Sequence, residues 1–153
     1  MNTKSISGPM TEKYQKDQIV CLMNEFENDL FIIHSGELII CTEEGSKITP
    51  IAILKEGEYI GELSFFDRNP RSAHVIALTD STLVRIPVES INTQMPSWLF
   101  TIANSITEKI RKADNLIQKN GIKQKAGSTL KPLSIEQQRL YMNKINERRQ
   151  AIV

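Results

Sequence analysis

The chain has 153 residues, 40% of them hydrophobic and 24% charged, with 19 Lys and Arg against 18 Asp and Glu. This globular composition argues against wholesale disorder or a collagen-like chain, and the length predicts one domain with an appendage. The apolar runs at residues 30–33 and 38–41 are far shorter than the roughly 18 residues that cross a bilayer, so we expect no membrane contact.

The charges are divided unevenly along the chain. Residues 1–108 hold 8 basic and 15 acidic residues, a net charge of −7, whereas residues 109–153 hold 11 and 3, a net charge of +8. A basic segment can bind nucleic acid, an acidic protein or the acidic part of its own chain. The plainer alternative is a solvated basic tail.

The N-terminal residues, 1–17, are polar and lack the apolar core of a secretory signal, which predicts a cytoplasmic protein. The two cysteines, Cys21 and Cys41, lie in apolar segments, where a free thiol acts as a small hydrophobic group. We therefore expect reduced thiols rather than a disulfide.

Between residues 19 and 87 short apolar segments alternate with turn residues, which predicts a β-rich domain. The predicted strands are residues 19–23, 30–34, 37–42, 51–54, 72–77 and 82–86, and the predicted turns are residues 24–29, 35–36, 43–50, 57–61 and 79–81. Strands at this regular spacing favour a sandwich or jelly roll. Residues 61–66 break the rhythm and predict a short helix between Gly61 and Asn69-Pro70.

A long helix is predicted to begin at Pro96-Ser97 and to end at Asn120-Gly121. Its apolar residues follow a heptad pattern, with spacings of 4, 3, 4, 3 and 4: Leu99, Ala103, Ile106, Ile110, Ala113 and Ile117. This seam predicts a homodimer. The alternative is a monomer in which the seam covers the β-domain.

The C-terminal part is predicted to contain a linker, residues 121–133, and a final helix. Ser134 and Gln137 have the spacing of a capping box, which marks the start of that helix. Such a short helix is marginal alone and needs a surface on which to dock.

Metal and catalytic sites have little support in the sequence. His34 and His74 are the two histidines, and no Cys-x-x-Cys motif accompanies them, so we predict no metal site. No nucleophile motif is present, and two cysteines are too few for an iron–sulfur cluster. We expect a protein that is not an enzyme.

The most informative segment, residues 54–75, reads LKEGEYIGELSFFDRNPRSAHV. A short helix that follows Gly61 offers free N–H groups to an anion. Arg71 has the planar guanidinium that suits a phosphate, and Ser72 and Ala73 add a hydroxyl and backbone amides. These groups predict a phosphate pocket.

Glu62 fits this pocket only with a separate task, because a carboxylate repels a phosphate. Accepting a hydrogen bond from a sugar hydroxyl would be such a task. The alternative interpretation pairs Glu62 with Arg71 in a plain salt bridge and makes Gly61 a turn residue.

The segment resembles the phosphate-binding cassette of cyclic-nucleotide-binding domains, the family that includes bacterial catabolite activators and the regulatory subunits of cyclic-AMP-dependent protein kinase. The matching motifs are Gly61-Glu62-Leu63, Phe65-Phe66, Asn69-Pro70 and Arg71-Ser72-Ala73. Residues 30–38 and 54–62 also resemble the family, and the likeness covers residues 14–118.

The resemblance implies a mainly β fold, an eight-stranded jelly roll followed by a long C-terminal helix that caps the ligand. The expected organisation is an arm at residues 1–13, the binding domain at residues 14–118 with its capping and dimerisation helix at about residues 96–118, and a basic linker and tail helix at residues 119–153.

The resemblance also implies the ligand site, made by Gly61, Glu62, Leu63, Ser64, Arg71, Ser72 and Ala73. Arg71 would pair with the cyclic phosphate, and Glu62 would accept from the ribose 2′-hydroxyl. The amides of Gly61, Leu63 and Ala73 and the Ser72 hydroxyl would complete the anion cradle. Ser72 favours cyclic AMP over cyclic GMP. The part of the long helix that would face the base contains Lys109, Arg111, Asp114 and Asn115.

Two departures from the family pattern stand out. Glycines common in the family are missing near residues 16–18 and 24–26, which affects turns rather than the pocket. The 35 residues after Gln118 are too few for a winged helix-turn-helix, so DNA binding is not expected.

Three functions remain open. The first is a stand-alone cyclic-nucleotide receptor that moves its long helix and basic tail when ligand binds, and the tail then meets a partner such as an acidic protein. The second is a ligand-independent scaffold that retains the cassette. The third is a receptor for a cyclic dinucleotide.

Overall fold

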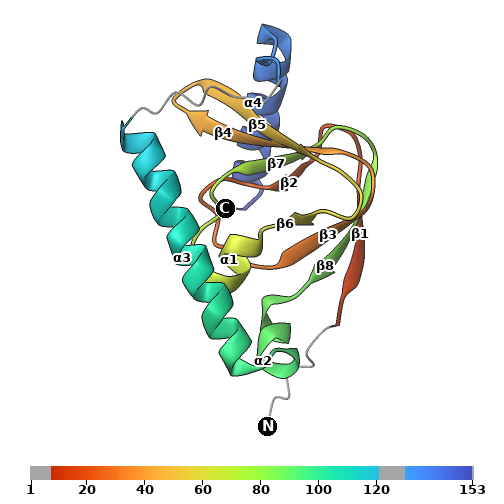
Figure 1. The fold of residues 1–153 in the computed structure, drawn as a ribbon. Helices are drawn as coiled ribbons and strands as arrows, with labels where there is room; N and C mark the ends of the chain where they lie inside the picture. Colours follow the sequence, from red (N-terminus) through yellow and green to blue (C-terminus); the bar gives the residue numbers. More distant parts are fainter. Residues whose placement is uncertain (1–7, 121–129, 153) are drawn as a thin grey trace.

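The computed structural model describes residues 8–120 and 130–152. Its β-domain has two four-stranded antiparallel sheets, in the orders β1-β8-β3-β6 and β2-β7-β4-β5 (Figure 1). The strands are β1 (Met10–Tyr14), β2 (Ile19–Cys21), β3 (Leu30–Ser35), β4 (Leu38–Glu44), β5 (Lys47–Leu54), β6 (Tyr59–Ile60), β7 (His74–Ala77) and β8 (Ser81–Ile86). The predicted eight-stranded jelly roll is confirmed.

Several predicted strand limits need correction. The predicted turn at residues 43–50 is wrong, because β4 and β5 continue through it and leave a tight turn at Gly45, whose φ is +60°. Glu44 lies opposite Lys47 in this hairpin, so opposite charges extend the ladder. The predicted strand at residues 72–77 begins only at His74.

Two short strands, β1 and β6, were not predicted. β1 lies within and just beyond the predicted arm at residues 1–13, and it pairs with β8 at the edge of its sheet. Its residues are exposed or half-buried, so hydrophobic alternation does not reveal it. β6 has two residues and depends on its pairing with β3.

The sheet β2-β7-β4-β5 separates two apolar clusters. One cluster fills the space between the sheets and includes Phe31, Ile33 and Leu83. The other includes Ile39 and Ile76 of the same sheet. Neighbouring residues of a strand point to opposite faces, so this sheet is apolar on both sides.

The remaining elements are helical: α1 (Glu62–Asp67), η1 (Val88–Ser90), α2 (Ile91–Gln94), α3 (Ser97–Asn120) and α4 (Ile135–Gln150). The predicted start and end of α3 are confirmed. The predicted linker lies for the most part outside the described residues. No helix in the described ranges is both long enough and apolar enough to span a membrane.

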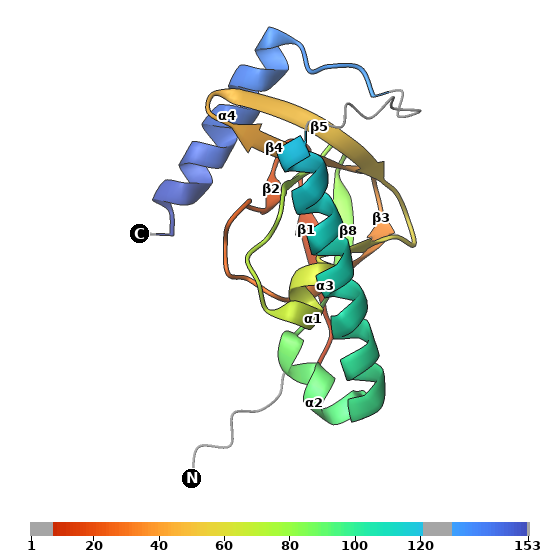
Figure 2. The same cartoon turned by 60° about the vertical axis from the view of Figure 1, so that its left-hand side comes forward.

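The long helix α3 lies alongside α1 (Figures 1 and 2). Thr107 and Arg111 belong to the face toward α1, where Thr107 is buried and Arg111 is half-buried. The predicted seam is turned elsewhere, since Leu99, Ile106 and Ile110 are 39%, 52% and 43% exposed. The alternative in which the seam covers the β-domain is therefore wrong. The side chain of Ile117 lies outside the described residues.

The tail helix α4 begins with the predicted capping box between Ser134 and Gln137. It docks across the outer face of the sheet β2-β7-β4-β5, where Tyr141 and Ile145 are fully buried (Figure 2). Gln138 accepts a hydrogen bond of 3.0 Å from the backbone N–H of Ile48. The basic tail thus meets the acidic part of its own chain.

His74, the first residue of β7, is fully buried at this interface. Its Nδ1 accepts from the backbone N–H of Met23 at 3.0 Å, so the proton of the neutral ring is on Nε2, which donates to Glu43 at 2.9 Å. Burial lowers the pKa of His74 below its usual value. Hydrogen bonds from Arg149 of α4, at 2.7 Å and 3.3 Å, are the main cause of the lowered pKa of Glu43.

We predict that stability falls in mild acid because of His74. The unfolded ring titrates near 6.5 and the folded ring lower, so below about pH 6.5 the unfolded chain binds more protons and the free energy of unfolding decreases. Urea unfolding at pH 7.5, 6.5 and 5.5 should show this decrease, and His74→Gln should flatten it. Glu43 acts in the same direction but below about pH 4.5.

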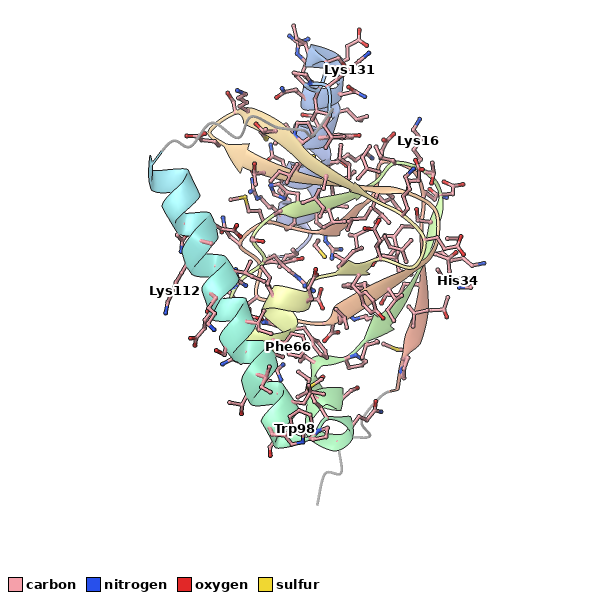
Figure 3. The ribbon with its side chains drawn as sticks, viewed as in Figure 1. Lys16, His34, Phe66, Trp98, Lys112 and Lys131 are labelled. Atoms are coloured by element: carbon pink, nitrogen blue, oxygen red, sulfur yellow. The ribbon has the colours of Figure 1, made fainter. Side chains whose placement is uncertain are left out.

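The matched control is His34→Gln. His34 is exposed at the far side of the β-domain from α3 (Figure 3), so the decrease should persist in this variant. An unchanged decrease in His74→Gln would contradict the assignment.

Candidate functional site

The seven predicted site residues all line one cavity of about 200 Å³. It lies beside α1 and is also lined by apolar residues of the strands, among them Ile40, Leu54, Ile60 and Val75. Arg71 and Ser64 are buried at the cavity, whereas Glu62 and Ser72 are exposed. The cavity therefore has apolar walls and one strongly polar end.

Gly61 permits a close approach between α1 and Arg71. Its φ of +84° is in the left-handed region, and a Cβ at this position would lie 1.6 Å from Nη1 of Arg71. Position 61 therefore requires glycine for two reasons: its left-handed backbone conformation and its lack of a side chain. The role of Gly61 thus goes beyond that of a turn residue.

Arg71 is a buried cation, with 4% of its side chain exposed. Its Nη2 donates to the backbone carbonyl of Asp29 at 2.5 Å and to Glu27 at 3.4 Å, and the guanidinium lies 5.9 Å from the centre of the Phe31 ring. Within the described residues, Nε and Nη1 are buried without a hydrogen-bond partner. Buried donors are costly unless a partner is provided, so two donors at this cavity remain to be satisfied.

The alternative in which Glu62 pairs with Arg71 is not what the structure contains, because the ion-pair partner of Arg71 is Glu27. Burial raises the pKa of Glu27, although Arg71 and Arg85 act in the opposite direction. The exposed Glu62 is left at the cavity to accept a hydrogen bond.

A network of carboxylates behind Arg71 was not predicted from the sequence. Arg85 of β8 binds Asp29 at 2.6 Å and both Glu27 and Glu12 at 3.2 Å. Asp29 also accepts from the backbone N–H of Val88 at 2.8 Å, the residue that begins η1. The alternating acids Glu25, Glu27 and Asp29 were the available signal, but they lie in a segment predicted only as a turn.

Arg111 connects α3 to α1. It forms an ion pair with Asp67, and its Nη2 reaches Ser64 and the carbonyl of Pro70 at 3.5 Å each. Burial alone would raise the pKa of Asp67, but hydrogen bonds from Arg111 and Asn69 outweigh it and lower the pKa. Arg111, which was expected in the region that contacts the nucleotide base, thus binds α1.

The other three residues of the region expected to contact a base, Lys109, Asp114 and Asn115, are exposed. Lys112 on the same helix points away from the β-domain (Figure 3). The described residues that line the cavity come from the β-domain and α1.

One group in the described ranges has potential metal ligands within 4.8 Å of one another: Cys21, Glu25 and Glu27. The chain itself engages these carboxylates, since Glu25 accepts from the backbone N–H of Leu22 at 2.8 Å and Glu27 binds two arginines. Burial raises the pKa of Cys21 to about 12, so its thiol is neutral. Both cysteines are free and buried. The two carboxylates thus stabilise the loop before β3.

The profile of the family "Cyclic nucleotide-binding domain" matches residues 11–97, more than half of the chain. The chain belongs to this family. The matched region contains all seven predicted site residues.

One relative is the cyclic AMP receptor protein of Thermus thermophilus, which is 25% identical over 105 residues, 66% of this chain and 49% of the relative. The chain thus spans about half the length of that protein. The crystal structure of the Thermus thermophilus catabolite activator protein superposes with a TM-score of 0.60 at 21% identity, over 74% of this chain and 55% of the other. The regulatory domain of Toxoplasma gondii PKA with cAMP gives 0.58 at 20% identity, over 69% and 40%. These structures share the fold.

We predict that Gly61→Ala destabilises the domain more than Gly57→Ala does. Both glycines have φ of +84°, so each alanine incurs the backbone strain of about 1–2 kcal/mol, but only a Cβ at Gly61 meets Arg71, whereas the space at Gly57 is open. The additional loss at Gly61 should be about 1–3 kcal/mol, as for other overpacked sites. Urea unfolding of the two variants measures the difference. Equal losses would show that Arg71 moves aside freely.

Proposed function

We propose that this protein is a receptor for a cyclic mononucleotide, with cyclic AMP favoured over cyclic GMP. The observation that carries the proposal is Arg71, a buried guanidinium with two unpartnered donors at the cavity. An anion supplies the missing acceptors. Charge-assisted hydrogen bonds of this kind are the strong ones, and a planar guanidinium binds a phosphate with two of its N–H groups.

The other cassette residues have complementary tasks. The backbone amides of Gly61, Leu63 and Ala73 and the hydroxyl of Ser72 surround the phosphate. Glu62, exposed at the cavity and separate from Arg71, accepts from the ribose 2′-hydroxyl without replacing Glu27 as the partner of Arg71. Ser72 supports the preference for cyclic AMP through the resemblance of Arg71-Ser72-Ala73 to cyclic-AMP-responsive activators.

The size of the cavity supports a mononucleotide over a cyclic dinucleotide. Its volume of about 200 Å³ is small beside the roughly 300–1,000 Å³ of typical ligand sites, so it suits the smaller of the two ligands better. A cyclic dinucleotide has twice the bases and sugars, so it needs more space than a mononucleotide beside Leu54 and Val75.

The proposed role is binding and signalling, with no catalytic step. Arg111 supports a route for the signal, because it joins α3 to Asp67 at the end of α1 and to the carbonyl that precedes Arg71. When a bound phosphate shifts Arg71 and α1, the position in which α3 packs best against them also changes. Ligand binding then selects one of two arrangements of α3 against the β-domain.

We further propose that α3 forms a homodimer through its seam. Leu99, Ile106 and Ile110 of the seam, with Ile102 beside them, make an exposed apolar stripe on a different face from the one that contacts α1. A second copy would bury this stripe in a coiled coil. A partner that binds the dimer would then sense the movement of α3.

Calorimetry with cyclic AMP, cyclic GMP and cyclic di-GMP tests the ligand. We expect cyclic AMP to bind in the micromolar range or tighter, cyclic GMP more weakly and cyclic di-GMP not at all. Arg71→Ala should weaken binding about 100-fold, because it removes two charge-assisted hydrogen bonds of roughly 1.5 kcal/mol or more each, and Glu62→Ala about tenfold.

The matched control is Arg68→Ala, which removes an exposed arginine that does not line the cavity. It should bind as the unmodified protein does. Retained affinity in both cassette variants would overturn the proposed site, and no binding of any of the three ligands would favour the scaffold function.

Sedimentation tests the dimer. Ile106→Glu places a charge in the middle of the apolar stripe and should shift the protein to the monomer, since Ile106 is 52% exposed among the described residues. Ser105→Glu makes the same charge change on an exposed position off the stripe and should leave the dimer intact. A monomeric unmodified protein would refute this interface.

A further inference from the structure

The cavity and the tail helix α4 share one sheet. Ile40 and Val75 line the cavity, whereas their chain neighbours Ile39 and Ile76 belong to the cluster with Tyr141 and Ile145 of α4. Whatever orders this sheet from its outer face therefore also orders one wall of the cavity. The extended part of the phosphate cassette continues directly into β7, the central strand between β2 and β4.

His74 is where the cassette meets the tail helix. It follows Ala73 in the chain, and its ring is held by the backbone N–H of Met23 on one side and by Glu43 on the other. The backbone of Arg71 is bound to the same loop, because its carbonyl accepts from Asn24 at 2.8 Å and its N–H donates to Glu25 at 2.9 Å. The segment 71–74 is thus attached to the segment 23–25 at both ends.

Arg149 completes this arrangement from α4. It binds Glu43 with two hydrogen bonds, and Glu43 is the acceptor that holds the His74 ring. If α4 were undocked, Glu43 would lose its cation and His74 would lose part of its cover. Glu43 would then form more favourable hydrogen bonds with water than with the His74 N–H. The start of β7 would therefore be held less firmly.

We propose that α4 is a positioning element of the ligand site, acting through Arg149, Glu43 and His74, so that docking of α4 and binding of the nucleotide stabilise each other. This inference depends on the proposed nucleotide binding. The coupling is reciprocal: an undocked tail weakens ligand binding, and an empty cavity loosens the tail. The ligand then controls the exposure of both α4 and the apolar sheet face beneath it.

The first test is calorimetry with cyclic AMP on the full chain. Arg149→Gln should weaken binding about fivefold, the low end of typical couplings between sites, and Arg149→Lys should recover part of the loss by keeping the charge. Arg139→Gln makes the same change at an exposed position near the other end of α4 and should leave the affinity unchanged. Equal affinity of Arg149→Gln and the unmodified protein would overturn the inference.

The second test is hydrogen exchange of the α4 amides with and without cyclic AMP. Cyclic AMP should slow exchange across residues 138–150 in the unmodified protein and leave it unchanged in Arg71→Ala, a response that a merely structural helix would not give. Exchange that ignores the ligand would contradict the coupling. This measurement needs no variant of Arg149, so it decides the question even if such a variant fails to fold.

The two proposals fail in different ways. If the unmodified protein binds cyclic AMP but neither affinity nor exchange responds as described, the nucleotide receptor stands and the role of α4 falls. If the unmodified protein binds no cyclic nucleotide, both fall.

Discussion

The buried guanidinium of Arg71 is the constraint on which the site depends. A cation at this depth needs fixed partners, and the chain provides them for one edge only, through the Asp29 carbonyl, Glu27 and the Phe31 ring. The other edge, with Nε and Nη1, has no protein acceptor in the described part of the chain. Gly61 leaves room for this edge, because a side chain at this position would occupy the space of Nη1.

The charged groups that hold Arg71 in place are separate from the donors that Arg71 offers to a ligand. Glu27 and Asp29 are themselves bound by Arg85, so they are fixed before a ligand enters and need no reorganisation when it binds. Asp29 also joins this network to Val88, at the start of the segment that leads into α3. Arg111 thus gives the cassette a direct contact with α3, and Asp29 connects the carboxylate network to η1. Such pre-organisation is what makes a small cavity able to bind a charged ligand.

The sheet β2-β7-β4-β5 is covered on its outer face by the tail helix α4. A sheet that is apolar on both faces must be covered on both, and here the second cover is α4, supplied by the basic part of the same chain. α3 has the opposite situation. One face contacts α1 and another carries the exposed stripe. Tyr141 and Ile145 of α4 are buried against the sheet, whereas Leu99, Ile106 and Ile110 of α3 are exposed among the described residues.

Much of this protein could be read from local sequence. The alternating strands, the breaks at Gly61 and Pro96, the heptad spacing and the capping box at Ser134 depend on near neighbours in the chain, and the cassette motif placed seven residues that the structure brings around one cavity. The edge strand β1, the hairpin through residues 43–50 and the carboxylates behind Arg71 depend on partners far away in the sequence. So do the pairing of Arg111 with Asp67 and that of Arg149 with Glu43, 106 residues apart. Local patterns determine which element forms and which face is apolar, but only the folded chain decides which charges meet, because ion pairs carry no sequence period.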